Sequence, residues 1–160
     1  TSEGVQLLIQ VMAMMVVLIA LVDLLNQLMS MMPLIEGSPL TLQRVLGWLM
    51  APIVWLMGIP WSEAQVAGSL MGTKTILNEF IAYLDLVNIP ADDLSDKSRL
   101  IMTYAMCGFA NLGSLGIMIA GISGIVPDRR SEIVELGPRS LLAGTLATCM
   151  TGTVVGIVVG

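Results

Sequence analysis

Long apolar stretches dominate this sequence and limit the environments in which it can fold. Three of them, 4–22, 100–126 and 140–160, approach or exceed the length needed to cross a bilayer, which is roughly 20 residues for a helix. Only 12% of the residues are charged, against about 25% in ordinary soluble domains. Because lipid offers backbone groups no water as a partner, stretches of this length favour helices. The sequence therefore predicts an all-α integral membrane protein.

Charge and composition argue against several classes of function. The net charge of −5 disfavours nucleic acid as a partner, because phosphate binding needs clustered Lys and Arg. The sequence has no His, and its two cysteines, Cys107 and Cys149, lie in separate apolar stretches. This placement favours buried side chains over a metal site or a disulfide. No nucleophile–base pair and no phosphate-binding loop is evident. We therefore expect neither an enzyme nor a resident cofactor or metal.

The first two elements are expected to be a membrane helix and a helix at the membrane surface. Residues 1–35 form one long span, tilted because its apolar run continues to Met32 and ends at Pro33. Residues 40–58 are mostly apolar but are broken at Pro52. Tryptophan favours the membrane–water interface, and three lie in or beside this segment: Trp48, Trp55 and Trp61. We expect an interfacial helix, with a kinked transmembrane helix as the alternative.

The stretch 62–86 is long enough to cross a membrane but carries several polar side chains, among them Lys74, Asn78 and Glu79. A carboxylate at membrane depth is costly unless it has a partner. For Glu79 that partner can be Lys74, Asn78, a neighbouring helix or a polar solute. Two structures fit: a single transmembrane helix with an internal charge cluster, or a re-entrant hairpin whose tip lies near 76–79.

Glycines interrupt the next apolar stretch, which we expect to be a discontinuous helix over 98–126. Asn111 and Ser114 lie near its centre, three residues apart and hence on one face of a helix or at one break. Discontinuous helices place free backbone groups at the membrane midplane, where polar solutes bind. The glycines are Gly108, Gly113, Gly116, Gly121 and Gly124.

The last span, 140–160, carries glycines at four-residue intervals, a spacing that lets helices approach closely. They are Gly152, Gly156 and Gly160. Three arginines lie in the connector 127–139, whereas the connector 88–97 is rich in Asp. Because connectors rich in Lys and Arg stay cytoplasmic, the last span is expected to run outward and to leave the C-terminus outside.

Four polar side chains are expected to meet at the middle of the membrane: Asn78 and Glu79 from one element, Asn111 and Ser114 from another. A carboxylate accepts hydrogen bonds, whereas an amide and a hydroxyl both donate and accept. Together they suit a ligand rich in hydroxyls, such as a sugar, because a carboxylate can accept two bonds from a vicinal diol. Phe109 can offer its face to a planar ring. Hydrogen bonds that hold helices together are the alternative role for Asn111 and Ser114.

Three runs of residues closely resemble the signature sequences of concentrative nucleoside transporters. They are GSLMGTK at 68–74, LNEFIAY at 77–83 and GFANLGSLGI at 108–117. The resemblance extends over most of the chain and includes 52–60. One departure is Ile81, which stands where valine is common in the family and should not alter the chemistry.

The resemblance implies that the chain is the C-terminal part of such a transporter. A scaffold helix at 1–35 would precede a transport-domain repeat at 36–160. That repeat would comprise an interfacial helix (40–58), a re-entrant hairpin (62–86), a broken helix (98–126) and a final span (140–160). By the same resemblance, Glu79, Asn111 and Ser114 would hold the ribose of a nucleoside, and Phe109 would lie next to the base.

The function expected from this resemblance is cation-coupled nucleoside import by alternating access. The coupling cation, Na+ or H+, would bind in the first half of the transporter, which this chain lacks. The expected partners are a nucleoside, membrane lipid and two further copies of the protein in a homotrimer in the plasma (inner) membrane. The alternative is a gate-like membrane domain that serves assembly or another polar solute.

Overall fold

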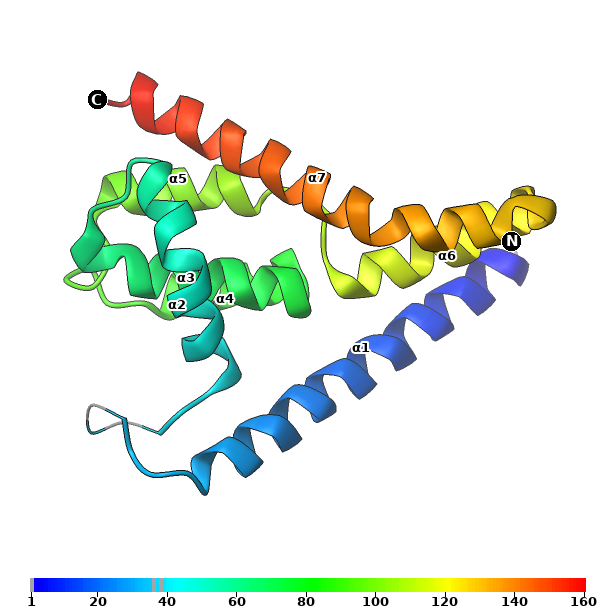
Figure 1. The fold of residues 1–160 in the computed structure, drawn as a ribbon, viewed down its shortest axis with the longest axis horizontal. Coiled ribbons are helices and arrows are strands. Elements are labelled where there is room, and N and C mark those ends of the chain that lie inside the picture. Colours follow the sequence, from blue (N-terminus) through cyan, green and yellow to red (C-terminus); the bar gives the residue numbers. More distant parts are fainter. Residues whose placement is uncertain (1, 36, 38) are drawn as a thin grey trace. The chain divides into compact units, whose positions relative to one another are not determined.

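The described part of the chain is built of helices. The computed structural model describes residues 2–35, 37 and 39–160, and within these residues every regular element is helical. Two compact units divide the chain, residues 1–42 and residues 43–160 (Figure 1). The all-helical class predicted from the apolar stretches is confirmed for the described residues.

The first unit is dominated by one helix, α1, which runs from Ser2 to Ser30. Its last turn is closed by the Ser30 hydroxyl, which donates to the Gln27 carbonyl at 2.7 Å. Further along the unit, the Leu42 N–H donates to the Asn26 side-chain oxygen at 2.8 Å. Many apolar side chains of α1 are exposed within this chain, which is the surface expected of a helix that faces lipid or another subunit.

The second unit begins with two helices that meet at a sharp bend. Helix α2 (Leu42–Leu56) and helix α3 (Trp61–Ile76) are bent by 118° relative to each other. The chain reverses at Gly58, whose φ of +99° is open to glycine at little cost. The helices cross closely because Gly47 and Gly68 have no side chains there. A Cβ on Gly68 would lie 2.5 Å from the Gly47 carbonyl oxygen.

Helices α4 (Glu79–Asn88) and α5 (Asp96–Met106) follow, and hydrogen bonds hold the end of α4 to the start of α5. The Arg99 guanidinium donates to three carbonyls at the end of α4 and the loop after it, those of Leu86, Ile89 and Pro90. At the start of α5, Glu63 of α3 accepts hydrogen bonds from the Ser95 N–H and hydroxyl. These bonds hold the start of α3 and the end of α4 to the start of α5.

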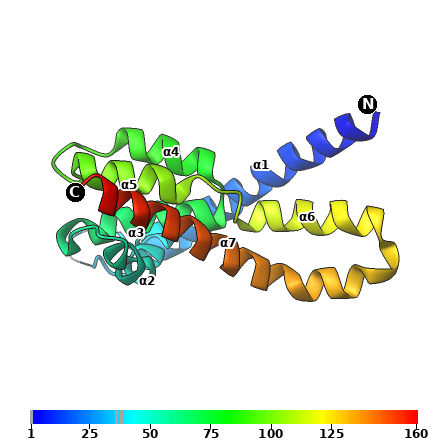
Figure 2. The ribbon, with the colours of Figure 1, turned by 90° about the horizontal axis from the view of Figure 1, so that it is seen from above.

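Helix α6 (Leu112–Ile125) and the short helix η1 (Pro127–Arg129) lead into the long helix α7 (Arg130–Val158), which runs back beside α6 and then α5 (Figure 2). Helix α7 starts ten residues before the expected span 140–160, so part of the predicted connector is helical. Gly152 and Gly156 face Ala105 and Ile101 of α5. In this chain the glycine spacing therefore serves packing between α5 and α7.

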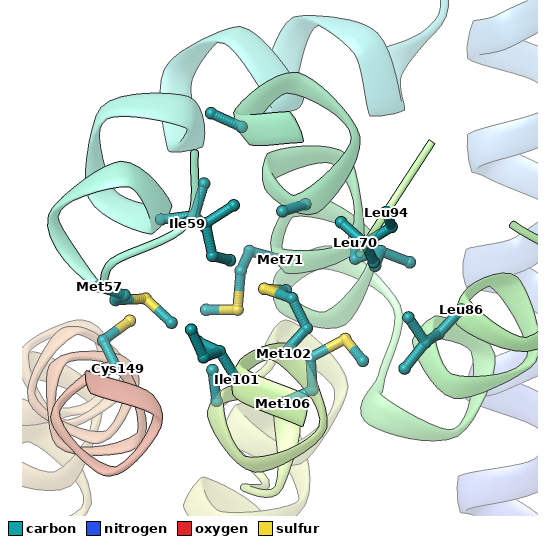
Figure 3. Packing of buried hydrophobic residues seen from close by; sticks show 14 of the residues in the cluster. Met57, Ile59, Leu70, Met71, Leu86, Leu94, Ile101, Met102, Met106 and Cys149 are labelled. Carbon is teal, nitrogen blue, oxygen red and sulfur yellow. The ribbon is translucent and has the colours of Figure 1, made fainter. Parts of the chain in front are cut away.

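A hydrophobic core forms where α2, α3, α5 and α7 meet (Figure 3). Its largest members are methionine and branched aliphatic side chains that are almost completely buried, including Met71, Ile101, Met102 and Met106. Cys149 of α7 points into the same cluster. Methionine adapts to irregular gaps between helices, which suits a core built from helices that are interrupted by breaks.

One continuous helical stretch among the described residues, 127–158, is long and apolar enough to cross a membrane. Helices α2 and α3 pass the same test as a bent pair. The segments 15–30 and 112–125 are shorter apolar helices. The apolar stretch 100–126 is thus not one helix, because it is divided between α5 and α6.

We expect Gly68→Ala to destabilise the second unit. The added Cβ meets backbone atoms of α2, which cannot move aside as a flexible side chain can, and overpacking of this kind costs about 1–3 kcal/mol. The measurement is the melting temperature of the purified protein in detergent. Gly121→Ala in α6 is the control, because its Cβ meets nothing within 4 Å. An equal drop for both variants would contradict the close α2–α3 crossing.

Candidate functional site

Two helices are interrupted at neighbouring places, and an asparagine restarts each of them. Helix α3 ends at Ile76 and α4 begins at Glu79. Between them, Asn78 has extended backbone angles, and its side-chain oxygen accepts a hydrogen bond from the Ile81 N–H at 2.9 Å. Asn78 is therefore the N-cap of α4, a position at which asparagine is among the favoured residues.

The second break repeats this arrangement. Helix α5 ends at Met106 and α6 begins at Leu112. Asn111, again extended, caps α6 by accepting from the Ser114 N–H at 2.7 Å. The sequence predicted that these asparagines are polar groups at breaks but missed their capping role. The available signal was an asparagine directly before each helix restart.

The two breaks are joined by one hydrogen bond between side chains. The Asn111 amide nitrogen donates to the Glu79 carboxylate at 3.1 Å. Asn111 is only 2% exposed, whereas Glu79 is half-buried. The Asn111 amide thus uses its oxygen for the helix cap and its nitrogen for the carboxylate. Glu79 also lies in the first turn of α4, where the positive end of the helix dipole favours a negative charge.

The other predicted site residues take different positions. Ser114 is half-buried in the first turn of α6, and its N–H is bound by Asn111. Phe109 lies in the unwound segment before α6 with 78% of its surface exposed. The Asn78 side-chain oxygen is directed to its own helix. Hydrogen bonds therefore connect Glu79 to Asn111 and Asn111 to the backbone of Ser114. Phe109 lies two residues before Asn111 in the sequence.

A hollow of about 590 Å³ lies between α6 and α7. From the break and α6 it is lined by Phe109, Asn111 and Ser114, and from α7 by Ser140, Leu141 and Gly144. Glu79 is not part of its lining, and most of the lining is apolar. We take the Glu79–Asn111 network as the candidate site, because it holds the polar groups that can recognise a ligand.

The chemistry of this network is recognition by hydrogen bonds. The Glu79 carboxylate accepts one bond from Asn111 and has further lone pairs for a ligand. A hydroxyl-bearing, uncharged ligand suits it, because the negative charge that two helix N-termini favour is already supplied by the protein. Within the described residues, no cluster of three or more Cys, Asp or Glu side chains is placed to hold a metal ion.

Comparison with known proteins relates this chain to nucleoside transporters. Residues 1–156 match the family model described as Na+ dependent nucleoside transporter C-terminus. The chain is similar to the nucleoside permease NupC of Helicobacter pylori, with 37% identity over 99% of this chain and 39% of the permease.

Solved structures of one transporter are similar as well. The structure of CNTnw in an inward-facing substrate-bound state matches with a TM-score of 0.84 and 39% identity, covering 97% of this chain and 39% of CNTnw. A CNTnw variant in an outward-facing state matches with a TM-score of 0.82 and 38% identity, covering 97% of this chain and 38% of CNTnw. The chain thus spans about two fifths of the length of the proteins it matches.

We expect Asn111→Asp to destabilise the protein more than Asn78→Asp does. Both variants keep an oxygen that can cap the following helix, but Asn111→Asp also replaces the donor to Glu79 with a second carboxylate. Loss of a hydrogen bond to a charged group costs about 1.5–3 kcal/mol. Melting temperatures in detergent at neutral pH would show the difference. Equal effects of the two substitutions would mean that the Asn111–Glu79 bond contributes nothing beyond the cap.

Proposed function

This chain belongs to the Na+ dependent nucleoside transporter family, whose C-terminal part it matches, and from this premise we propose that it forms the ribose-binding part of a cation-coupled nucleoside importer. Members of this family are integral membrane transporters, and the relatives named above are permeases or transporters. The observation that carries the proposal is the hydrogen bond between Asn111 and Glu79, because it holds a half-buried carboxylate at the meeting point of two helix breaks.

In the proposed complex, Glu79 accepts hydrogen bonds from the ribose hydroxyls. A carboxylate has two oxygens and can accept from both members of a vicinal diol, and such charge-assisted bonds are stronger than neutral ones. Asn111 keeps the carboxylate in position from one side. The Ser114 hydroxyl, in the first turn of α6, supplies a further donor or acceptor to the sugar.

The base of the nucleoside is proposed to lie against Phe109. This ring is 78% exposed in a segment that is otherwise at the edge of the site. An exposed aromatic face stacks on a planar heterocycle with little preference for its hydrogen-bonding groups. Phe109 would therefore contribute affinity for many nucleosides, and discrimination between bases would come from residues outside this chain.

The two breaks are proposed to lie at membrane depth. Helices α3 and α4 then form a re-entrant hairpin with its tip at 77–78, and α5 and α6 form a discontinuous helix. Irregular backbone is tolerated at this depth where protein or a watery cavity surrounds it. The caps by Asn78 and Asn111 support this placement, because they satisfy backbone N–H groups that lipid could not.

Import is proposed to proceed by alternating access, in a homotrimer of the inner membrane with the C-terminus outside. Structures of the related CNTnw include inward-facing and outward-facing states. The coupling cation, Na+ or H+, is proposed to bind in the half of the transporter that precedes this chain. The three arginines of 127–139 support a cytoplasmic position for that segment.

We expect Glu79→Gln to weaken uridine binding to the complete transporter by about ten- to a hundredfold, because a neutral amide loses the charge-assisted bonds to ribose. Titration calorimetry on the purified protein measures this change. Glu63→Gln is the matched control, since Glu63 is an acid on the same hairpin that binds Ser95 at its outer end. Near-normal affinity of Glu79→Gln would refute the proposed ribose site.

A ligand comparison tests the diol contact itself. The analogue 2′,3′-dideoxyuridine lacks both hydroxyls, so it should bind the wild-type transporter weakly and lose little more when Glu79 is changed to Gln. If the substitution weakens uridine and the analogue by the same factor, Glu79 acts elsewhere than on the ribose.

A further inference from the structure

Lys74 is the one charged side chain that is fully buried in the described part of the chain. It lies in the last turn of α3, directly before the break at 77–78, and none of its surface is exposed. Its ammonium nitrogen has no hydrogen-bond partner among the described residues. A long flexible side chain placed in this way could readily be replaced by an apolar one of similar size, so packing alone does not explain the charge.

Lys74 lies beside the apolar core of the second unit. Lys74 follows Met71 by three residues and so lies on the same face of α3, the face that packs into the core shown in Figure 3. Glu79 is the first residue of α4, five positions after Lys74 and directly across the break at 77–78. A buried cation requires an opposite charge nearby. Glu79 is the acid closest to Lys74 along the chain.

Glu79 and Lys74 do not form a closed ion pair. The described hydrogen bond of the carboxylate comes from Asn111, and the ammonium is not within bonding distance of an acceptor. The carboxylate is therefore not closed off by a direct bond to the lysine and stays available to a ligand. Both lie on the α3–α4 hairpin, on either side of the same break, so they move together in any motion of that hairpin.

This arrangement matters for the step in which an importer returns without substrate. A bound ribose surrounds the carboxylate with hydroxyl donors, but after release the same carboxylate must cross the membrane barrier without them. An uncompensated charge in a low-dielectric environment raises that barrier strongly. A cation on the same hairpin offsets the charge of the site both with and without substrate.

We infer that Lys74 is the built-in counter-ion of Glu79, and that it lets the empty nucleoside site return across the membrane without carrying an uncompensated charge. This inference rests on the proposed nucleoside transport. It assigns to Lys74 a role in the empty step of the cycle, without contact with the substrate.

The test compares two transport modes of the complete transporter in proteoliposomes. Net uptake of labelled uridine down a gradient of the coupling cation requires the empty carrier to return. Exchange of labelled external uridine for unlabelled internal uridine, with the cation equal on both sides, does not. We expect Lys74→Met and Lys74→Gln to lower net uptake relative to exchange by about tenfold or more, because one bare charge raises the barrier by more than a decade in rate.

Two further variants are measured beside them. Lys74→Arg keeps the charge and should keep the wild-type ratio of net uptake to exchange. Thr75→Val, on the same turn of α3, alters local packing without altering charge and should also keep that ratio. An inside-negative membrane potential should accelerate net uptake by Lys74→Met more than by the wild type, because the returning site then carries a negative charge outward.

Each outcome decides the matter. An unchanged ratio in Lys74→Met and Lys74→Gln overturns the inference. So does an equal loss of both modes, or failure of both variants to reach the membrane, because either result assigns Lys74 a structural role. If the wild-type protein neither takes up nor exchanges uridine, the proposed function itself fails, which is a different result from a changed Lys74 variant in a working transporter.

Discussion

A helix that stops inside an apolar protein leaves backbone N–H and C=O groups that must find partners within the protein. Two helices of this chain stop and restart side by side, so the requirement falls on a few polar side chains. Asn78 and Asn111 meet it as caps. Asn111 also donates to Glu79, so one amide satisfies the backbone and fixes the carboxylate. The two helix breaks therefore create the candidate site, and the asparagine caps at the starts of α4 and α6 stabilise those breaks.

The half-helices on either side of the second break share no backbone ladder, and α7 keeps them in line. It packs against α5 before the break and against α6 after it. The contacts are close because of small residues: a Cβ on Gly108 would meet Thr148 at 2.4 Å, and a Cβ on Gly144 would meet Ala110 at 3.1 Å. The continuous helix α7 thus holds α5 and α6 in position, and the position of Asn111 between them depends on α7.

Much of this arrangement could be predicted from the sequence, and the remainder has physical reasons. Glycines and a central polar pair predicted a discontinuity in 98–126, and polar residues in 62–86 left a hairpin as one of two alternatives. The caps were missed because Asn78 and Asn111 were weighed as ligand groups, whereas their first partners are backbone N–H groups. Helix α7 starts ten residues before the expected span: the charged segment 127–139 indicates a connector, whereas most of it is helical and includes Pro138.

The break at 77–78 also explains how a chain this apolar can hold two opposite charges five residues apart. In an uninterrupted helix, Lys74 and Glu79 would be five residues apart, on different faces, with neither at a helix end. The break places Lys74 in the last turn of α3, where the helix dipole favours a cation, and Glu79 in the first turn of α4, where it favours an anion. Each charge is therefore stabilised by the half-helix that carries it. A carboxylate supported in this way is stabilised without a direct hydrogen bond to its own lysine.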